Sequence, residues 1–420
     1  MSGTKQSLFT AAVAIFILCC AGLSIGQSVP PQIPKPKIRA ITGFVHLDRA
    51  NYQAQVRGTL AVLRQAKTEF EHAGYEVQSV RITTQPFPEI VHGLSPADAL
   101  KFFQDYDKLA HTENFDASIG PAMVSDGDDP KMADLLADIL SSTTGLEGSI
   151  IVAGEDGMHW SAIRAAAHLM KNVEQHSPHS QGNFNFAATA MLPPHAPFFP
   201  GSYHDDSGHE FAIGMQSASI VAAAFASAPG DPNAAARALA SLLTQHAQTV
   251  EQIAHTVEKK TGWRYLGLDL SPAPLKEDSI GTAIENFTKA RFGSSGTMTA
   301  VSIITGVLKQ IPVQHAGYSG LMLPILEDST LAQRWTEGGL TIDGMLAYSA
   351  ICGTGLDTIP LPGDVTEEQL AKMIGDMASL AFKWHKPLSA RLLPVAGKKP
   401  GDRTEFDDPF LVNATLQRLP

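Results

Sequence analysis

The sequence predicts an α/β fold, a barrel of about ten strands surrounded by helices in a single large domain. Apolar segments typical of buried strands alternate with segments of helical spacing along almost the whole chain. No Rossmann glycine fingerprint follows any of these strands, and many strands without it favour a closed barrel over an open sheet. A composition of 44% hydrophobic and 17% charged residues is ordinary for a chain that buries a large core.

The expected strands are short apolar segments bounded by turn residues. The first of them, residues 38–45, is typical of a buried strand, and the others recur between helical segments. This alternation is the pattern of a largely parallel sheet. The expected strands are residues 38–45, 75–82, 117–124, 149–153, 184–192, 211–215, 265–270, 321–326 and 388–395.

Helices are expected between these strands, and several have recognisable start signals. Ser95 with Asp98, and Thr366 with Gln369, have the spacing of a capping box. Asp231, followed by proline, is typical of the residue that caps a helix. The expected helices are residues 56–70, 95–106, 132–140, 160–173, 220–225, 231–260, 297–308, 342–350 and 366–385.

The N-terminus has the pattern of a targeting segment. Lys5 is the only charged residue before an apolar run over residues 8–25, and small residues suited to signal peptidase follow. We therefore expect a signal peptide over residues 1–26, a proline-rich tether over 27–37 and the α/β domain over 38–420. The protein is expected to be exported, either periplasmic or secreted. The run is short for a membrane span, which favours a cleaved signal peptide. If the segment stays uncleaved, it would be the protein's one membrane tether.

The charge balance narrows the class of partner. The net charge is −11, from 31 Lys and Arg against 42 Asp and Glu. An acidic chain without a basic stripe interleaved with aromatic residues argues against nucleic acid as a partner. A small molecule is the expected partner, and homo-oligomerisation is left open.

A lone thiol stands out in the mature chain. Two of the 3 cysteines, Cys19 and Cys20, belong to the expected leader, so Cys352 remains alone and no internal disulfide is expected. Cys352 is either a buried structural thiol or a nucleophile activated by a nearby base. It opens a segment, residues 352–364, with three glycines, two prolines and two aspartates. We expect this segment to be a loop in which Gly353 and Gly355 position Asp357 near the start of a barrel strand.

Several polar loops are expected to meet at one barrel mouth, because loops after parallel strands converge on one face. These loops are residues 193–204, 269–278, 327–328, 352–364 and 397–402. Their side chains predict a mixed-charge pocket suited to a small polar or anionic metabolite. The residues concerned are Asp269, Ser271, Asp278, Glu327, Asp328, Asp357, Arg391, Lys398 and His204.

Each candidate has a structural alternative. Asp269, Asp357, Glu327 and Asp328 suit acid–base or metal chemistry, but the Glu327–Asp328 pair equally suits a helix N-terminus. Lys398 pairs with an anion or lies in a solvated turn. The loop before residue 297 offers backbone N–H groups to an anion, but it lacks the lysine of a P-loop. That loop consists of Gly293, Ser294, Ser295 and Gly296.

Metal and cofactor content stay open. His204, Asp205, Asp206, His209 and Glu210 form a candidate metal cluster, although no established metal spacing matches and a solvated loop is the alternative. The sequence contains no G-x-S-x-G elbow, no H-E-x-x-H and no Walker loop. It therefore names neither a cofactor nor a reaction.

Five stretches together resemble the UPF0210 family, also called DUF711. They are residues 197–204, with the sequence Pro-Phe-Phe-Pro-Gly-Ser-Tyr-His, and residues 267–274, 317–328, 350–364 and 390–402. The resemblance covers nearly all of residues 38–416. It implies a barrel of about ten strands related to the pyruvate formate-lyase-like fold, in agreement with the strand pattern. The apparent export signal departs from a mostly cytoplasmic family and argues against an intracellular metabolic role.

The resemblance does not imply radical chemistry. Glycyl radical enzymes carry Arg-Val-x-Gly followed by an aromatic residue near the C-terminus, and residues 391–398 do not fit it. We therefore expect a non-radical enzyme acting on a small anionic metabolite. Asp269, Glu327, Asp328 and Asp357 would perform acid–base or metal work, with Cys352 near the barrel centre. Arg391, Lys398, His204, Ser271 and the 293–296 loop would bind the ligand. The alternatives are an exported binding protein without turnover and a structural or interaction protein.

Overall fold

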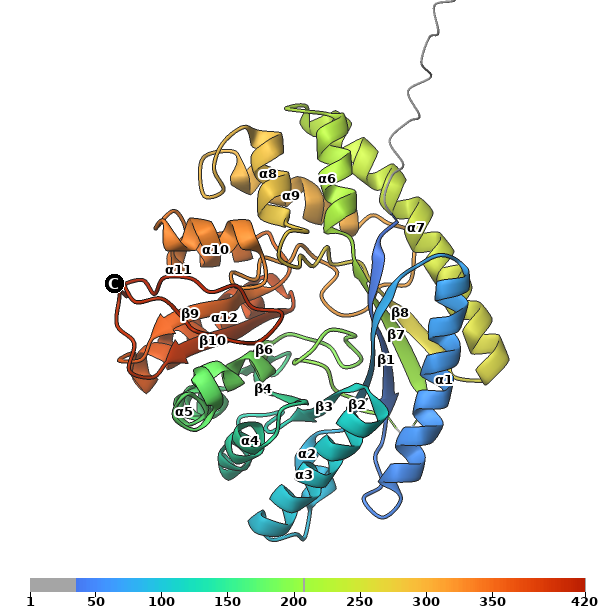
Figure 1. Cartoon of the computed structure of the whole chain (residues 1–420), viewed down its shortest axis with the longest axis vertical. Coiled ribbons are helices and arrows are strands. Elements are labelled where there is room, and N and C mark those ends of the chain that lie inside the picture. Colours follow the sequence, from blue (N-terminus) through green and yellow to red (C-terminus); the bar gives the residue numbers. More distant parts are fainter. Residues whose placement is uncertain (1–34, 207, 420) are drawn as a thin grey trace, which may run out of the picture. The chain divides into compact units, whose positions relative to one another are not determined.

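A ten-stranded sheet forms the centre of the protein, and helices surround it (Figure 1). The computed structural model describes residues 35–206 and 208–419. The strand order is β8-β7-β1-β2-β3-β4-β6-β10-β9, with β5 paired to β4. The strands are β1 Lys37–Val45, β2 Val77–Thr84, β3 Asp116–Pro121, β4 Leu146–Gly154, β5 Gly157–Met158, β6 Phe186–Ala190, β7 Glu210–Gln216, β8 Arg264–Asp269, β9 Gly355–Pro362 and β10 Leu388–Val395.

Helices connect most of the strands, as the alternating pattern predicts. Ser95 accepts a hydrogen bond from the Asp98 N–H at the start of α3, and Thr366 with Gln369 forms a complete capping box at the start of α12. The helices are α1 Tyr52–His72, α2 Phe87–Val91, α3 Pro96–Glu113, α4 Lys131–Ser142, α5 Trp160–His176, α6 Ala218–Ser227, α7 Pro232–Thr261, α8 Ile280–Thr288, α9 Thr297–Leu308, α10 Ser329–Thr336, α11 Ile342–Ser349 and α12 Glu367–Trp384, with the 3₁₀ segment η1 Pro178–Asn185.

The sheet is mixed. Strands β1, β2, β3, β4 and β6 are mutually parallel, as predicted. At the two flanks the direction reverses, because β7 is antiparallel to β1 and β10 is antiparallel to β6. The last pairs, β7 with β8 and β10 with β9, are again parallel.

Two sequence predictions are wrong around the edge strand β9. Residues 352–364 were expected to form a loop, but Gly355–Pro362 is a strand paired with β10. Proline lacks an N–H group, so it is tolerated in a strand with one free edge, and Pro360 and Pro362 occupy such a strand. Residues 321–326, expected to be a strand, have no regular secondary structure. Pro324 falls inside that segment.

An irregular segment bridges the two ends of the sheet. No strand ladder joins β8 to β9 within the described residues. Instead, the Gln314 carbonyl accepts from the Leu268 N–H in β8 at 2.8 Å. Further along the same segment, the Ile325 N–H donates to the Asp357 carbonyl in β9 at 3.0 Å. The chain between these contacts therefore spans the gap that a barrel would close with strand pairing.

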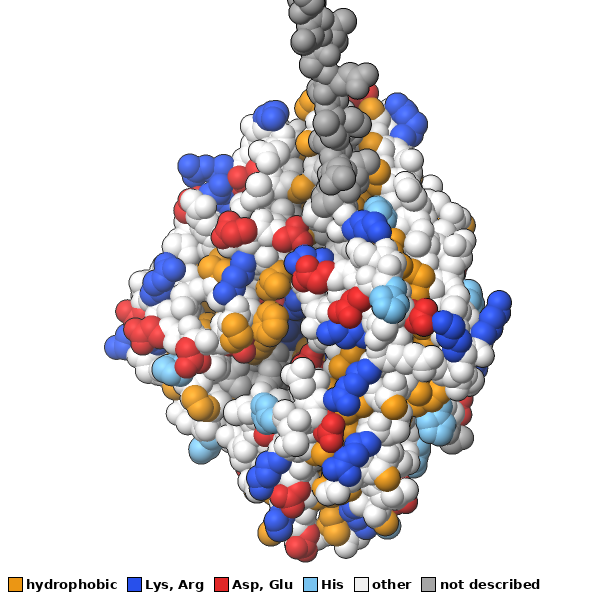
Figure 2. All heavy atoms as spheres, turned by 45° about the vertical axis from the view of Figure 1, so that its right-hand side comes forward, with side chains coloured by type: hydrophobic (Ala, Val, Ile, Leu, Met, Phe, Trp, Pro, Cys, Tyr) orange, Lys and Arg blue, Asp and Glu red, His pale blue; other side chains and the backbone are white. Residues whose placement is uncertain are grey.

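Residues 35–206 and 208–419 belong to one compact unit. The expected signal peptide and most of the expected tether lie outside the described residues, and Lys37 already belongs to β1. None of the helices in the described ranges is long and apolar enough to cross a bilayer. On the face in Figure 2, acidic and basic side chains are interspersed, with hydrophobic side chains between them.

Candidate functional site

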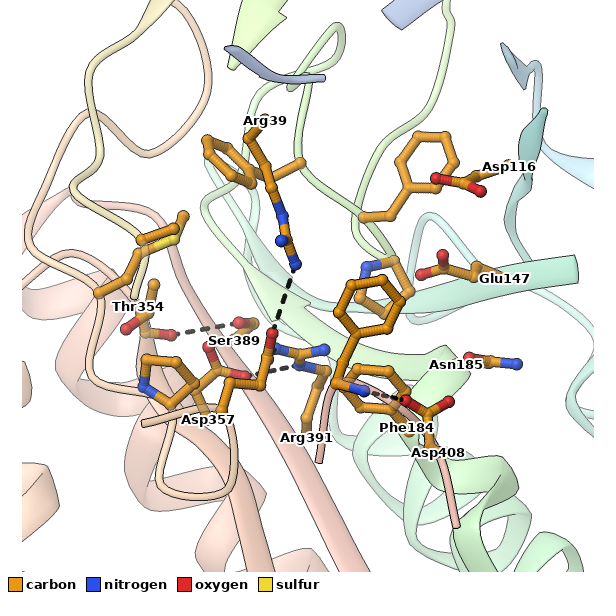
Figure 3. Close-up of a pocket in the computed structure, with 18 of the residues that line it drawn as sticks. Arg39, Asp116, Glu147, Phe184, Asn185, Thr354, Asp357, Ser389, Arg391 and Asp408 are labelled. Atoms are coloured by element: carbon orange, nitrogen blue, oxygen red, sulfur yellow. Dashed lines mark hydrogen bonds and ion pairs between the residues drawn. The ribbon is translucent and has the colours of Figure 1, made fainter. Parts of the chain in front are cut away.

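A cavity of about 200 Å³ is walled by side chains from strands β1, β2, β3, β4, β9 and β10. Successive side chains of a strand point to opposite faces, so residues two apart share a face. Arg81 and Thr83 in β2 share a face in this way, as do Ser389 and Arg391 in β10. Figure 3 shows the labelled side chains converging on the cavity from several elements. The wall facing the cavity is therefore polar although the strands are largely apolar.

Three arginine side chains reach the cavity, and each guanidinium lies over an aromatic ring. Guanidinium groups are weakly hydrated and planar, so they stack on aromatic faces while keeping N–H groups free for anions. Each aromatic residue comes from outside the strand that carries its arginine. The pairs are Arg39 with Phe410 at 5.2 Å, Arg81 with Phe199 at 4.9 Å and Arg391 with Phe184 at 5.0 Å from the ring centroid.

Arg391 joins two carboxylates at one side of the cavity. Its Nε donates to Asp357 Oδ1 at 2.6 Å, and its Nη2 donates to Glu327 Oε1. Arg39 Nη2 lies 3.7 Å from the other Glu327 oxygen. Burial raises the pKa of the Asp357 carboxyl, Arg391 opposes that effect and Glu327 adds to it. The structure thus brings together Asp357, Glu327 and Arg391, which the sequence placed in one predicted pocket.

Glu147, the second residue of β4, faces the same cavity without a partner. No described residue forms a hydrogen bond or ion pair with its carboxyl group. Burial raises the pKa of Glu147 to about 8, although Arg81 and Arg391 act in the opposite direction. Its side chain is partly accessible from the cavity, so water there moderates this shift. The burial of Glu147 thus favours its neutral, protonated form, in a cavity that three arginines also line.

The guanidinium groups of Arg39 and Arg81 keep donors available. Arg81 Nε donates to Ser79 Oγ at 2.8 Å and lies 3.4 Å from Asp116. The terminal nitrogens of Arg81 make no hydrogen bond to a described residue. Burial and the neighbouring charges of Arg81 and Arg391 lower the pKa of Arg39, which shows how close the three cations are. The cavity also holds the carboxyl groups of Asp116, Glu147, Glu327, Asp357 and Asp408, so its charges are mixed.

A loop that follows β6 covers one side of the cavity. We call residues 193–204 the inserted loop. The Thr42 hydroxyl of β1 donates to the Pro197 carbonyl at 2.8 Å, and the Thr83 and Ser118 hydroxyls donate to the Ser202 carbonyl. These contacts hold the loop between strands, so Phe198, Phe199 and Pro200 line the cavity.

Residues 32–407 match the family model described as "Uncharacterised ACR (DUF711)". The chain belongs to the DUF711 (UPF0210) family. It is 32% identical over 353 residues to a UPF0210 protein of Pyrobaculum arsenaticum, covering 78% of this chain and 76% of that protein. A UPF0210 protein of Lactobacillus delbrueckii subsp. bulgaricus is 27% identical, covering 83% of this chain and 80% of the relative. The family resemblance stated from five stretches is therefore confirmed.

Other residues predicted for the site lie elsewhere in this DUF711 chain. Asp269 does not line the cavity; it accepts hydrogen bonds from Ser271 N–H and Oγ and from the N–H groups of Tyr318 and Ser319. Burial raises the pKa of Asp269 to about 6 in spite of these bonds. We call this arrangement the Asp269 clamp. It fixes the backbone of residues 318–320, because the Ser271 hydroxyl accepts in turn from the Gly320 N–H.

The predicted Glu327–Asp328 pair divides between two roles. Glu327 lies in the cavity, whereas Asp328 caps α10 by accepting from the Thr330 and Leu331 N–H groups. Asp328 also accepts from the Gly281 N–H and the Ser279 hydroxyl near the start of α8. Asp328 therefore has the helix-terminus role that was the alternative. Glu327 is the member of the pair that remains a candidate for acid–base chemistry in the cavity.

The remaining ligand-binding candidates are also away from the cavity wall. Cys352 is buried, and its carbonyl accepts from the Lys386 ammonium group. The 293–296 loop precedes α9, where the Gly293 N–H donates to Thr297 Oγ1 at 3.1 Å. Lys398 pairs with Glu405 at 2.9 Å.

The five predicted loops fared unevenly. Loops 193–204, 269–278, 327–328 and 352–364 each contribute to the cavity, and residues 397–402 do not. Four of the five predicted loops therefore contribute to one cavity. Strand residues supply much of the wall, because their side chains point inward along the strands.

The sequence reasoning missed five charged residues of the cavity. They are Arg39, Arg81, Asp116, Glu147 and Asp408. The available signal was a polar residue two positions from another in an otherwise apolar strand. Asp116 with Ser118 and Glu147 with Ser149 have this spacing.

Proposed function

We propose that the cavity binds a small anionic metabolite and transfers protons on it by non-radical acid–base chemistry. One observation carries the proposal: three guanidinium groups and the unpaired Glu147 carboxyl surround a single cavity. A volume of about 200 Å³ is below the roughly 300–1,000 Å³ of pockets for drug-sized ligands, which favours a small metabolite. Positive groups beside a protonated carboxyl suit a carboxylate or phosphate substrate.

The residues then take distinct roles. The free N–H groups of Arg81, with Arg39, bind the anionic group. Glu147 donates a proton to the substrate, and Asp357 accepts one from it, so the substrate's proton count is unchanged. Figure 3 draws Glu147 and Asp357 on opposite sides of the cavity, as an acid and a base flanking a substrate require. Arg391 is a positioning residue, since it holds Asp357 and Glu327.

Calorimetric titration of the purified mature protein tests binding. The probes are inorganic phosphate and a panel of two- to four-carbon mono- and dicarboxylates. We expect at least one probe to bind, and Arg81→Ala to weaken it at least about tenfold through loss of charge-assisted hydrogen bonds. Arg291→Ala is the matched control, because Arg291 is 73% exposed and away from the cavity. Equal binding by the Arg81→Ala variant and wild type would contradict the assignment.

Turnover is measured separately from binding. Proton transfer to carbon predicts that a bound probe incorporates deuterium from D₂O, as followed by NMR, and that Asp357→Asn abolishes the incorporation. A probe that binds but is recovered unchanged would support the alternative, a binding protein without turnover.

Export remains part of the proposal. The charge and apolar pattern of residues 1–26 support a signal peptide. N-terminal sequencing of the protein from its native host should find a mature chain beginning near residue 27. An intact Met1 in the cytoplasmic fraction would contradict export.

A further inference from the structure

A second polar cluster lies at the base of the inserted loop. Nε2 of His195 is 2.9 Å from Nδ1 of His204, and these two atoms lie 3.8 and 3.6 Å from Glu210 Oε2. His195 and His204 stand at opposite ends of the loop, where the His195 N–H donates to the Tyr203 carbonyl. Glu210 begins β7. Three side chains, two from the inserted loop and one from β7, thus bring one nitrogen or oxygen each to the same point.

The Glu210 carboxylate is buried, and only one of its two oxygens has a hydrogen-bond partner among the described residues. Glu210 is 2% exposed, and its Oε1 accepts from Arg264 at 2.5 Å. Its Oε2 has no hydrogen-bond partner among the described residues. A buried carboxylate oxygen without a partner costs free energy, and a cation bound to it would offset that cost. His204 is fully buried beside it.

The spacing of the three atoms suits a metal ion. Zinc binds histidine nitrogen and carboxylate oxygen at about 2.0–2.2 Å, so ligands at the corners of a tetrahedron are about 3.3 Å apart. The separations of 2.9, 3.6 and 3.8 Å lie on both sides of that value. A set of two imidazoles and one carboxylate favours a first-row divalent transition metal over Mg²⁺ or Ca²⁺, which prefer oxygen ligands.

We propose that His195 Nε2, His204 Nδ1 and Glu210 Oε2 bind a divalent transition-metal ion of the zinc class. Asp205 is the protein group available for the fourth position, since its Oδ1 is 3.4 Å from His195 Nε2 and its side chain is exposed. Arg264 orients Glu210 from the other side, as groups next to a metal site commonly do. His209, part of the cluster predicted from sequence, is excluded because its ring packs against Trp263 at 5.2 Å.

The metal would fasten the inserted loop. It joins both ends of the loop to β7, next to the point where the His204 N–H donates to the Thr84 carbonyl of β2. The tip of the same loop places Phe199 over Arg81 in the cavity. The site is therefore a structural clamp for the cavity wall, and it stands independently of any reaction proposed there.

The test uses the purified mature protein, stripped with chelator and titrated with Zn²⁺ by calorimetry. We expect one equivalent of zinc per chain and a higher unfolding temperature with zinc bound. His195→Ala, at a partly exposed position, and the isosteric Glu210→Gln should each weaken zinc binding at least about 100-fold and remove the zinc-dependent stabilisation. His209→Ala is the matched control and should bind zinc like wild type.

X-ray absorption of the zinc-loaded wild-type protein provides a readout that needs no variant. We expect scattering from two imidazole rings at about 2.0 Å, with oxygen completing the shell. The proposal is overturned if stripped wild-type protein binds no stoichiometric zinc, if the spectrum lacks two imidazoles, or if folded His195→Ala binds zinc like wild type.

Discussion

Asp269 and Asp357 are two buried aspartates that the sequence treats alike, yet their surroundings differ. Asp269 accepts hydrogen bonds mainly from backbone N–H groups of residues 271, 318 and 319, with the Ser271 hydroxyl added. Asp357 instead pairs with the side chain of Arg391 and lines a cavity. Backbone partners cannot move away to make room for a substrate, whereas a carboxylate at a cavity wall can meet one. The hydrogen-bond partners of each buried aspartate, more than its burial, therefore distinguish the structural Asp269 from Asp357, which can meet a ligand at the cavity wall.

The largest effect is expected from Asp269→Asn. Tyr318 donates to one carboxylate oxygen while Ser271 and Ser319 donate to the other, so an amide NH₂ group must face at least one N–H donor. We expect a loss of about 2–3 kcal/mol in the free energy of unfolding, measured with urea. Asp376→Asn, on the exposed face of α12, is the control. A loss of unfolding free energy no greater than that of the control would show that Asp269 is not a structural residue.

A smaller stability effect is expected from the same substitution at Asp357. Asparagine still accepts from Arg391, and the Glu327 carboxylate remains to balance the guanidinium charge. We expect less than about 1 kcal/mol of destabilisation in the same urea measurement. A loss as large as that of Asp269→Asn would show that both aspartates are structural.

A third effect is a pH dependence that belongs to the cavity alone, and water in the cavity reduces its size. The pKa of Glu147 in the folded protein is raised to about 8, above its ordinary value of 4.5. Its contribution to stability is therefore complete below pH 4.5 and is lost as the pH rises through about 8. Glu147→Gln cannot lose a proton, so the unfolding temperature of the variant should rise relative to wild type between pH 5 and 9.

The control for this pH series is Glu368→Gln, on the exposed start of α12. Scanning calorimetry of wild type and both variants gives the comparison. A difference between wild type and Glu147→Gln that stays constant over the pH range would show that Glu147 has an ordinary pKa.

Local signals predicted most elements correctly. The capping residues Ser95, Thr366 and Asp231 each act at the helix start where they were expected. The short helices α2, α8 and α10 were not among the expected elements, although Ser279 and Asp328 cap α8 and α10 and a helix start at Glu327–Asp328 was one stated alternative. The edge strand β9 was mistaken for a loop because Pro360 and Pro362 argue against a central strand, and sequence alone does not say which strand lies at an edge.

The candidate site was predicted only in part. Asp357, Glu327 and Arg391 were assigned to one pocket, and the structure joins them. Arg81 and Glu147 were missed because attention rested on loops, although strand side chains that point inward form much of the wall.

By itself, the sequence determined the α/β alternation, the family and most helix boundaries, because these depend on patterns within about 20 residues. Only the tertiary structure decided what each buried carboxylate does. Arg391 follows Asp357 by 34 residues, and Tyr318 follows Asp269 by 49. Partners so distant are chosen by strand order and by the loops that cross the sheet. Two aspartates with similar local sequence therefore became, respectively, part of a cavity and part of a clamp.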